Sequence, residues 1–168
     1  MFWDILASAT NNDKCGNTDE EKENFLLINK IALWDIFKSG YRNKNEKRGI
    51  SSDKAINFDD ARAPLPTQNE IWENLQNIEA IIINGKTDAF KWFTKYNNVV
   101  YSSKLYDKDI DTDYYIWNKK IKVYPLKQTK SIENYNDTIE KEKWINLLKK
   151  LLYGNDNSKP KKFIIKKK

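Results

Sequence analysis

Three apolar runs interrupt an otherwise polar chain and predict its strands. They are IALWDIF (residues 31–37), EAIIIN (79–84) and IKVYPL (121–126). The second run is apolar at consecutive positions, which is typical of a strand with helices over both faces. We therefore predict three adjacent central strands that run largely parallel.

Helical spacing of apolar residues appears between and around these runs. Two of the predicted helices begin with a capping box, formed by Thr18 with Glu21 and by Thr67 with Glu70. Strands that alternate with helices predict an α/β fold, a three-layer sandwich with a central, mostly parallel sheet. The predicted helices cover residues 2–7, 18–27, 69–78, 87–96 and 138–152.

The remaining segments are predicted to be loops, and the apolar stripes of the helices and strands predict which side chains are buried. A long polar stretch (39–66), a tyrosine-rich insertion (102–115) and residues 128–137 carry no clear period and are expected to be loops. The apolar stripes carry four tryptophans that we expect in the core, Trp34, Trp72, Trp92 and Trp144, and the last helix should bury Ile139, Trp144, Leu147, Leu148 and Leu151.

Composition favours one domain with a polyanionic partner. A chain of 168 residues with 39% hydrophobic content can bury one core. We expect one α/β domain over residues 1–153 and a basic C-terminal tail over 154–168. The net charge is +6, and the final KPKKFIIKKK contributes six lysines and no acid. That tail is either a solvated terminus or a phosphate-binding arm.

Several classes of chemistry are excluded. The chain has no histidine and one cysteine, Cys15, so zinc sites, disulfides and Ser-His or Cys-His catalysis are ruled out. We expect no cofactor and no metal. The first residues lack the pattern of a signal peptide, and no run approaches the roughly 20 apolar residues that span a bilayer. We therefore expect a cytoplasmic monomer with no membrane partner.

The order of several motifs resembles a known family. IALWDIF, SSDKAI (51–56), IIINGKTDAF (81–90) and IENYND (132–137), the last before an amphipathic helix, are similar to segments of the DNA-deoxyinosine (hypoxanthine) glycosylases of the uracil-DNA glycosylase superfamily. The resemblance covers most of residues 2–152. It implies a uracil-DNA-glycosylase-like fold, DNA or a nucleotide as partner, and flipping and excision of deaminated bases, hypoxanthine or uracil, in DNA repair.

The resemblance also implies a site at the carboxyl ends of the strands. The family's asparagine that contacts the extruded base corresponds to Asn84, and Gly85 would let the chain turn without blocking a pocket. Without the resemblance, Asn84 and Gly85 are simply a strand-ending turn. Ser131 and Asn134 match two positions of the family's Ser-Thr-Ser-Pro-Ala-Asn loop beside the flipped nucleotide. Asn84 and Asn134 are the expected catalytic residues.

A wider set of residues is expected to contact the base or the DNA. For Asp35, the alternative to such a contact is a structural role. For Ser52 and Asp53, the alternative is capping of a helix. The basic residues of the long polar stretch suit phosphate contacts, and a solvated loop is their alternative. The expected contacts are Asp35, Arg42, Arg48, Ser52, Asp53, Asn84, Gly85, Lys130 and Ser131.

Two departures from the family lower the expected activity. The family's first strand, Gly-Ser-x-Pro-Gly, and the loop Asn-x-Phe-Trp that positions the hydrolytic water have no counterpart in the sequence. Residues 129–134 read TKSIEN, which lacks the family's proline. We therefore expect weak or absent excision. The alternative is a non-catalytic descendant that binds a nucleotide, a nucleic acid or a protein.

Overall fold

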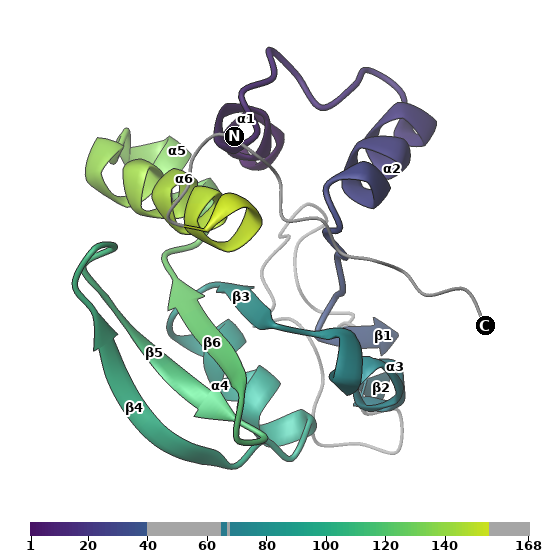
Figure 1. Cartoon of the computed structure of the whole chain (residues 1–168), viewed down its shortest axis with the longest axis vertical. Helices are drawn as coiled ribbons and strands as arrows, with labels where there is room; N and C mark the ends of the chain where they lie inside the picture. The colour runs from purple at the N-terminus through teal and green to yellow at the C-terminus, as the bar shows by residue number, and fades with distance from the viewer. Residues whose placement is uncertain (40–64, 67, 155–168) are drawn as a thin grey trace, which may run out of the picture.

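A computed structural model describes residues 1–39, 65–66 and 68–154 of the chain. They form an α/β structure in which helices flank a mixed sheet of four strands, with the strand order β3-β6-β5-β4 (Figure 1). A second sheet pairs only two short strands, β1 and β2. The elements are α1 (Phe2–Ala9), α2 (Asp19–Ile28), β1 (Phe37–Ser39), β2 (Leu65–Pro66), α3 (Gln68–Asn74), the 3₁₀ helix η2 (Leu75–Asn77), β3 (Ala80–Asn84), α4 (Asp88–Tyr96), β4 (Tyr101–Asp107), β5 (Thr112–Trp117), β6 (Ile121–Leu126), α5 (Thr129–Tyr135) and α6 (Thr138–Tyr153).

The central pair of strands, β3 and β6, agrees with the sequence prediction. These two strands are adjacent and parallel, in a register that runs from Ala80 opposite Lys122 to Asn84 opposite Leu126. Their carboxyl ends therefore lie side by side at one edge of the sheet. Both strands are short runs that contain β-branched residues and few charges. Such a run suits a strand whose two faces are both covered by other parts of the protein.

The predicted strand IALWDIF is wrong. Residues 31–35 have no regular secondary structure, and only Phe37 from this run enters a strand, the short β1. β1 pairs antiparallel with β2, outside the four-stranded sheet. Leu33 and Trp34 are 47% and 42% exposed, so this run does not have the two covered faces that a central strand needs.

The tyrosine-rich insertion instead supplies two strands. Residues 101–107 and 112–117 form the antiparallel hairpin of β4 and β5, and β5 pairs antiparallel with β6. The sheet is thus mixed, and the prediction of a mostly parallel sheet is wrong for this half. Asn118 and Lys119, both at positive φ, form the tight turn between β5 and β6. Aromatic and β-branched residues favour these strands, but charged residues lie among them and no regular alternation marks either strand.

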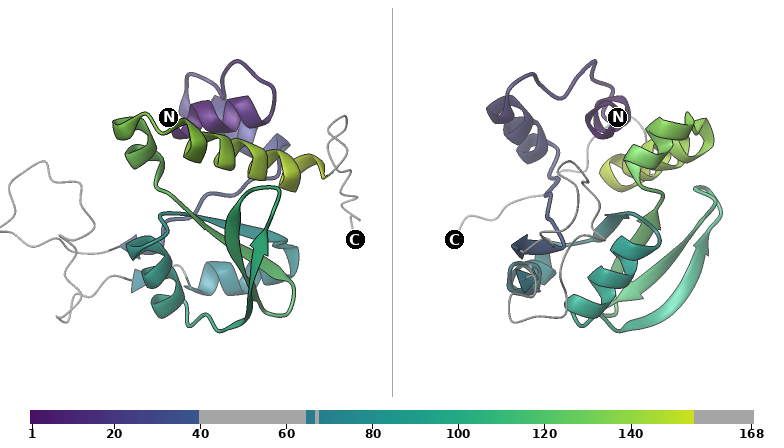
Figure 2. Two further views of the ribbon diagram at one scale, coloured as in Figure 1. Left: turned by 90° about the vertical axis from the view of Figure 1, so that its left-hand side faces the viewer. Right: turned by 180° about the vertical axis from the view of Figure 1, so that it is seen from behind.

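Helices cover both faces of the sheet. α4 packs on one face, where Phe93 meets Ile83 and Val123; seen from behind, it lies in front of the sheet (Figure 2). α1 and α6 lie side by side and cover Tyr124 and Leu126 on the other face. Parallel strands sandwiched in this way account for the two separate clusters of buried side chains.

The tryptophan predictions are partly confirmed. Trp144 is 2% exposed in α6, as expected, while Trp92 is only partly buried. Trp34 and Trp72 are about two-fifths exposed, so their prediction as core residues is wrong. Trp72 lies on the rim, where its ring packs edge to face against Trp117, a buried tryptophan that the helical pattern missed.

Helix ends follow the expected local rules where the structure describes them. Thr18 and Glu21 form the predicted capping box of α2. Thr67 and the basic tail beyond Gly154 lie outside the described residues. No helix in the described part of the chain is both long and apolar enough to cross a membrane.

The apolar face of α6 gives a direct test of the core. Leu147 is fully buried, whereas Ile139, which we predicted on the same face, is 69% exposed in the first turn. We expect Leu147→Ala to lower the free energy of unfolding by about 2–5 kcal/mol, because it removes contacts in a closed core. Ile139→Ala is the matched control and should change it by less than about 0.5 kcal/mol. Urea denaturation of both variants measures this, and equal effects would contradict the packing described.

Candidate functional site

The carboxyl edge of β3 and β6 gathers the segments that the sequence singled out. Because Asn84 and Leu126 are register partners, the residues that follow each strand start from the same place. Gly85 and Lys86 lead from β3 into α4, and Lys127 leads from β6 towards α5. In an open α/β sheet such an edge is where ligands bind.

Asn84 projects from this edge and is held by the start of α5. Its side chain is exposed. Its Oδ1 accepts a hydrogen bond from the backbone N–H of Thr129 at 2.8 Å, and its Nδ2 donates to Thr129 Oγ1 at 3.2 Å. An asparagine amide has two N–H donors and two acceptor lone pairs, so one of each remains.

Gly85 is required by the backbone. Its φ is +141°, a region that side chains disfavour, and a Cβ at this position would come within 2.9 Å of Ala89 Cβ in α4. The N–H of Gly85 donates to the carbonyl of Leu126 at 2.9 Å, which extends the pairing of β3 with β6. The glycine thus lets the chain leave the strand and enter α4 at close range.

The segment carrying Ser131 and Asn134 is a helix rather than the predicted loop. α5 buries Thr129 and Ile132, which lie three residues apart on one helical face. Ser131 is partly buried, while Lys130 and Asn134 are exposed. Asn84 contacts the first residue of this helix, so the structure places the predicted residues of β3 and α5 in neighbouring elements.

The other predicted contacts lie elsewhere. Asp35 is exposed in the irregular segment before β1. Arg42, Arg48, Ser52 and Asp53 lie outside the described residues. Their roles stay predictions.

A hollow of about 330 Å³ lies beside the predicted site, at the end of β6. Asn84 does not line it. Pro125 and Leu126 both line it, and Leu126 is the register partner of Asn84. Its lining combines apolar and charged side chains: Lys86, Phe90, Tyr106, Asp111, Thr112, Asp113, Tyr115, Pro125, Leu126, Lys127, Glu140 and Lys143.

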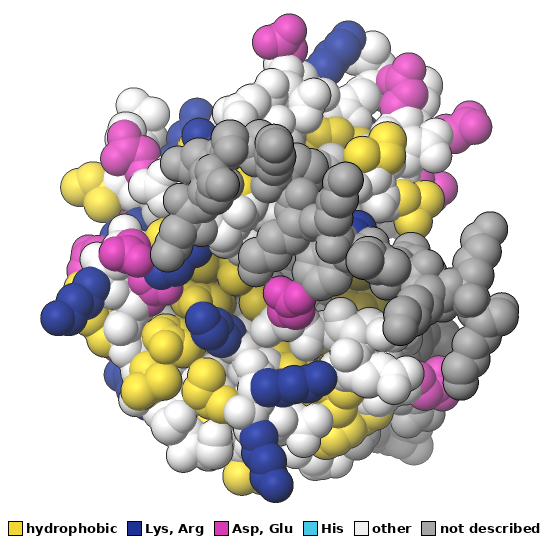
Figure 3. Space-filling model, viewed as in Figure 1, with side chains coloured by type: hydrophobic (Ala, Val, Ile, Leu, Met, Phe, Trp, Pro, Cys, Tyr) yellow, Lys and Arg dark blue, Asp and Glu magenta, His cyan; other side chains and the backbone are white. Residues whose placement is uncertain are grey.

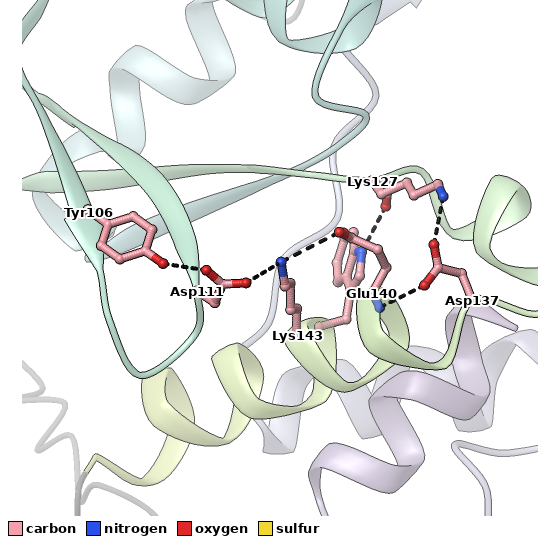
Figure 4. Close-up of polar contacts among 7 residues, drawn as sticks. Tyr106, Asp111, Lys127, Asp137, Glu140 and Lys143 are labelled. Carbon is pink, nitrogen blue, oxygen red and sulfur yellow. Dashed lines mark hydrogen bonds and ion pairs between the residues drawn. The ribbon is translucent and has the colours of Figure 1, made fainter.

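A chain of polar contacts ties the hairpin to α6 along this hollow (Figure 4). The Tyr106 hydroxyl donates to the Asp111 carboxylate, which pairs with Lys143 at 2.9 Å. Lys143 lies 3.6 Å from Glu140 on its own helix. The hydrogen bonds from Tyr106 and Lys143 hold the pKa of Asp111 below its ordinary value, so this carboxylate stays ionised.

A second ion pair fixes the end of β6. Lys127 pairs with Asp137 at 2.7 Å, and Asp137 also caps α6 by accepting the N–H of Glu140 at 3.2 Å. The hydrogen bond from Lys127 lowers the pKa of Asp137. The indole N–H of Trp144 donates to the carbonyl of Lys127 at 2.9 Å. Lys127 is therefore anchored on both its side chain and its backbone.

Asp107 is a buried carboxylate that the sequence analysis did not single out. Lys150 of α6 donates to its two oxygens at 2.8 and 3.0 Å, and the Tyr124 hydroxyl donates at 3.3 Å. Burial acts to raise the pKa of Asp107, but the hydrogen bonds and charge of Lys150 outweigh it and lower the pKa. Burial and the neighbouring Asp107 charge raise the pKa of Tyr124. The link fixes the hairpin on α6.

The surface around the edge is mixed in charge. Lysine side chains lie among hydrophobic ones over the sheet half of the molecule (Figure 3). Lys86 is exposed directly after Gly85. Within the described residues, no three carboxylate or cysteine side chains are grouped so that they could hold a metal ion.

Comparison with known proteins gives one partial match. A protein named hypoxanthine DNA glycosylase from Methanosarcina barkeri is 29% identical over 85 residues, which are 51% of this chain and 48% of that protein. The chain thus spans about half the length of this relative. No family model and no solved structure matches the chain. The match supports a relationship to hypoxanthine DNA glycosylases over about half of the chain.

The Asp107 link predicts a pH-dependent stability. The pKa of Asp107 is lowered on folding, so its contribution is present above the unfolded value of about 3.9 and is lost as the pH falls through the folded value. We expect Asp107→Asn to lower the free energy of unfolding by about 1.5–3 kcal/mol at pH 7. That difference should shrink below about pH 4.

Urea denaturation of both proteins between pH 7 and pH 3 measures this difference. Asp109→Asn is the control, because Asp109 contacts the same lysine but is largely exposed, and its effect should stay below about 1 kcal/mol. A difference between wild type and Asp107→Asn that stays constant with pH would contradict the link.

The contact between Asn84 and Thr129 predicts a local effect. We expect Asn84→Ala to speed hydrogen exchange of the Thr129 amide and to lower the free energy of unfolding by roughly 1–2 kcal/mol, since two hydrogen bonds are lost. NMR hydrogen exchange measures the first effect. Asn146→Ala, at an exposed position of α6, is the matched control. Unchanged exchange at Thr129 would show that the contact does not form in solution.

Proposed function

We propose that this protein binds DNA and holds a single base at the carboxyl edge of β3 and β6, where Asn84 contacts the base. The observation that carries the proposal is the position of Asn84: an exposed amide at the end of a strand, beside a parallel neighbour, followed by a required glycine. The partial match to a hypoxanthine DNA glycosylase supports the kind of ligand.

Base recognition at this edge follows from the chemistry of the amide. Asparagine donates and accepts hydrogen bonds, and base edges present donors and acceptors in fixed patterns. A base that has left the stack can present its whole Watson–Crick edge to such a side chain, as in enzymes that act on flipped bases. Gly85 lets the chain turn directly after Asn84 and pass close to Ala89 of α4. Ser131 and Asn134, on α5, are proposed to contact the nucleotide around the base.

Phosphate contacts complete the proposed interface. Lys86 and Lys130 are exposed on the segments that leave β3 and β6. Lysines position DNA through its backbone and carry no sequence information. Arg42, Arg48, Ser52 and Asp53 are proposed to add further contacts, and Asp35 to contact the base or a neighbouring loop.

Excision of hypoxanthine or uracil is the enzymatic form of this proposal, with Asn84 and Asn134 as its catalytic residues. A second candidate function is base or nucleotide binding without hydrolysis. The observation that favours it is the sequence of residues 129–134, TKSIEN, which lacks the proline of the family's loop beside the flipped nucleotide.

Binding to oligonucleotides with one altered base tests the proposal. We expect the protein to prefer an oligonucleotide with a single hypoxanthine over the same strand with adenine. Asn84→Ala should remove this preference, a change of roughly tenfold, because it removes the hydrogen-bonding amide. Asn146→Ala should bind as wild type does. Fluorescence anisotropy at fixed salt measures all three.

The same samples distinguish hydrolysis from binding. After incubation, alkali cleaves abasic sites, so strand scission that Asn84→Ala abolishes supports excision. A base preference without scission supports binding alone. If Asn84→Ala keeps the full preference of the wild type, the base is not held at Asn84 and the proposal is wrong.

A further inference from the structure

Both hydrogen bonds of the Asn84 amide go to one residue. Thr129 donates its backbone N–H to Oδ1 and accepts from Nδ2 with its Oγ1. One residue reaches both atoms only along the edge of the amide where the oxygen and one N–H lie side by side. The backbone N–H must meet an oxygen, so the contact also fixes which way the amide faces.

The groups that remain free cannot replace this edge. The second lone pair of Oδ1 and the second N–H of Nδ2 point away from each other, at opposite ends of the amide. A base edge such as N1–H and O6 of hypoxanthine presents a donor and an acceptor next to each other. Two-point contact with that edge therefore needs the atoms that Thr129 already occupies.

We propose that Thr129 determines the specificity of the site by occupying the paired edge of Asn84, the side of its amide on which Oδ1 and one N–H lie next to each other. With the edge closed, Asn84 keeps one N–H donor and one acceptor lone pair at opposite ends of the amide, so it contacts a base through a single hydrogen bond. A base that binds through two hydrogen bonds has to displace Thr129. This inference rests on the proposed function, because it assumes that Asn84 contacts a base.

The burial of Thr129 keeps the edge closed. Thr129 is 6% exposed, so its N–H has little access to water when Asn84 leaves it. An unpartnered buried N–H is costly, and that cost opposes two-point binding. The closed state reduces discrimination between bases, since every base presents a donor or an acceptor that can make a single hydrogen bond.

A proline at position 129 opens the edge while preserving the helix. Thr129 is the first residue of α5, and proline is favoured at the first helical position. Gln128, at φ −59° and ψ 130°, has the conformation that a residue before proline adopts. Thr129→Pro removes both the N–H and the Oγ1. Thr129→Val removes only the Oγ1, and Thr129→Ser keeps both groups and serves as the control.

Binding of the full chain to the hypoxanthine and adenine oligonucleotides tests the inference. We expect Thr129→Pro to bind the hypoxanthine strand roughly tenfold more tightly than wild type, as two-point contacts replace one, with no change for the same strand carrying an abasic site in place of the base. The adenine strand should gain as well, because adenine also presents an adjacent donor and acceptor. Thr129→Val should gain about threefold. Thr129→Ser should match wild type. Adding Asn84→Ala to Thr129→Pro should remove the gain.

The outcomes separate the two proposals. If wild type shows a preference that Asn84→Ala removes, but neither Thr129→Pro nor Thr129→Val binds hypoxanthine more tightly, Asn84 holds the base and the inference about Thr129 is wrong. If no protein of the set distinguishes the hypoxanthine strand from the adenine and abasic strands, the proposed function fails, and the inference fails with it. Should Thr129→Pro not fold, as judged by thermal denaturation, the Thr129→Val result decides.

Discussion

The parallel pairing of β3 with β6 sets the geometry of the whole carboxyl edge. Its register places Asn84 opposite Leu126, so residues 85–87 and 127–129 leave the sheet together. A slip of one residue would turn the Asn84 side chain to the face covered by α4 and away from α5. The hydrogen bonds between Asn84 and Thr129, across 45 positions of the sequence, depend on this register.

Ion pairs between the β4–β5 hairpin and α6 hold the rest of the edge in place. Lys150 binds the buried Asp107, and Lys143 binds Asp111 one to two helical turns earlier. The hairpin thereby occupies the side of β6 opposite β3, and the predicted strand IALWDIF does not join this sheet. Because the hairpin, α6 and the end of β6 line one hollow, the position of each affects its shape. Positioning of polar groups by a rigid surrounding is what a binding site of this kind requires.

Local signals in the sequence were sufficient for some elements. β3 and β6 follow from short β-branched runs, α2 from its capping box, and Asn84 with Gly85 from the break at the end of a strand. Each of these depends on neighbours within a few residues. IALWDIF misled because an apolar run without a period does not show whether its faces will be covered. The hairpin was missed because neither of its strands alternates apolar with polar residues and charged residues lie throughout it.

Contacts between distant residues could not be predicted in the same way. α5 looked like a loop, since its start is held by Asn84 rather than by a cap of its own. Asp107 gave no signal because its partner Lys150 is 43 residues away. The position of Asn84 was thus predictable, whereas its partner Thr129, and with it the groups that the amide has left to offer, required the fold.

The central claim is that a base is held at the carboxyl edge of β3 and β6. Its most direct test is NMR of the ¹⁵N-labelled chain titrated with two short oligonucleotides that differ only in one hypoxanthine. Shift changes common to both strands report backbone contacts, and those specific to hypoxanthine report the base. The account predicts that the specific changes concentrate at the Asn84 side chain, at Gly85 and at Thr129. Specific changes confined to the opposite edge, around the turn at Asn118 and Lys119, would contradict it.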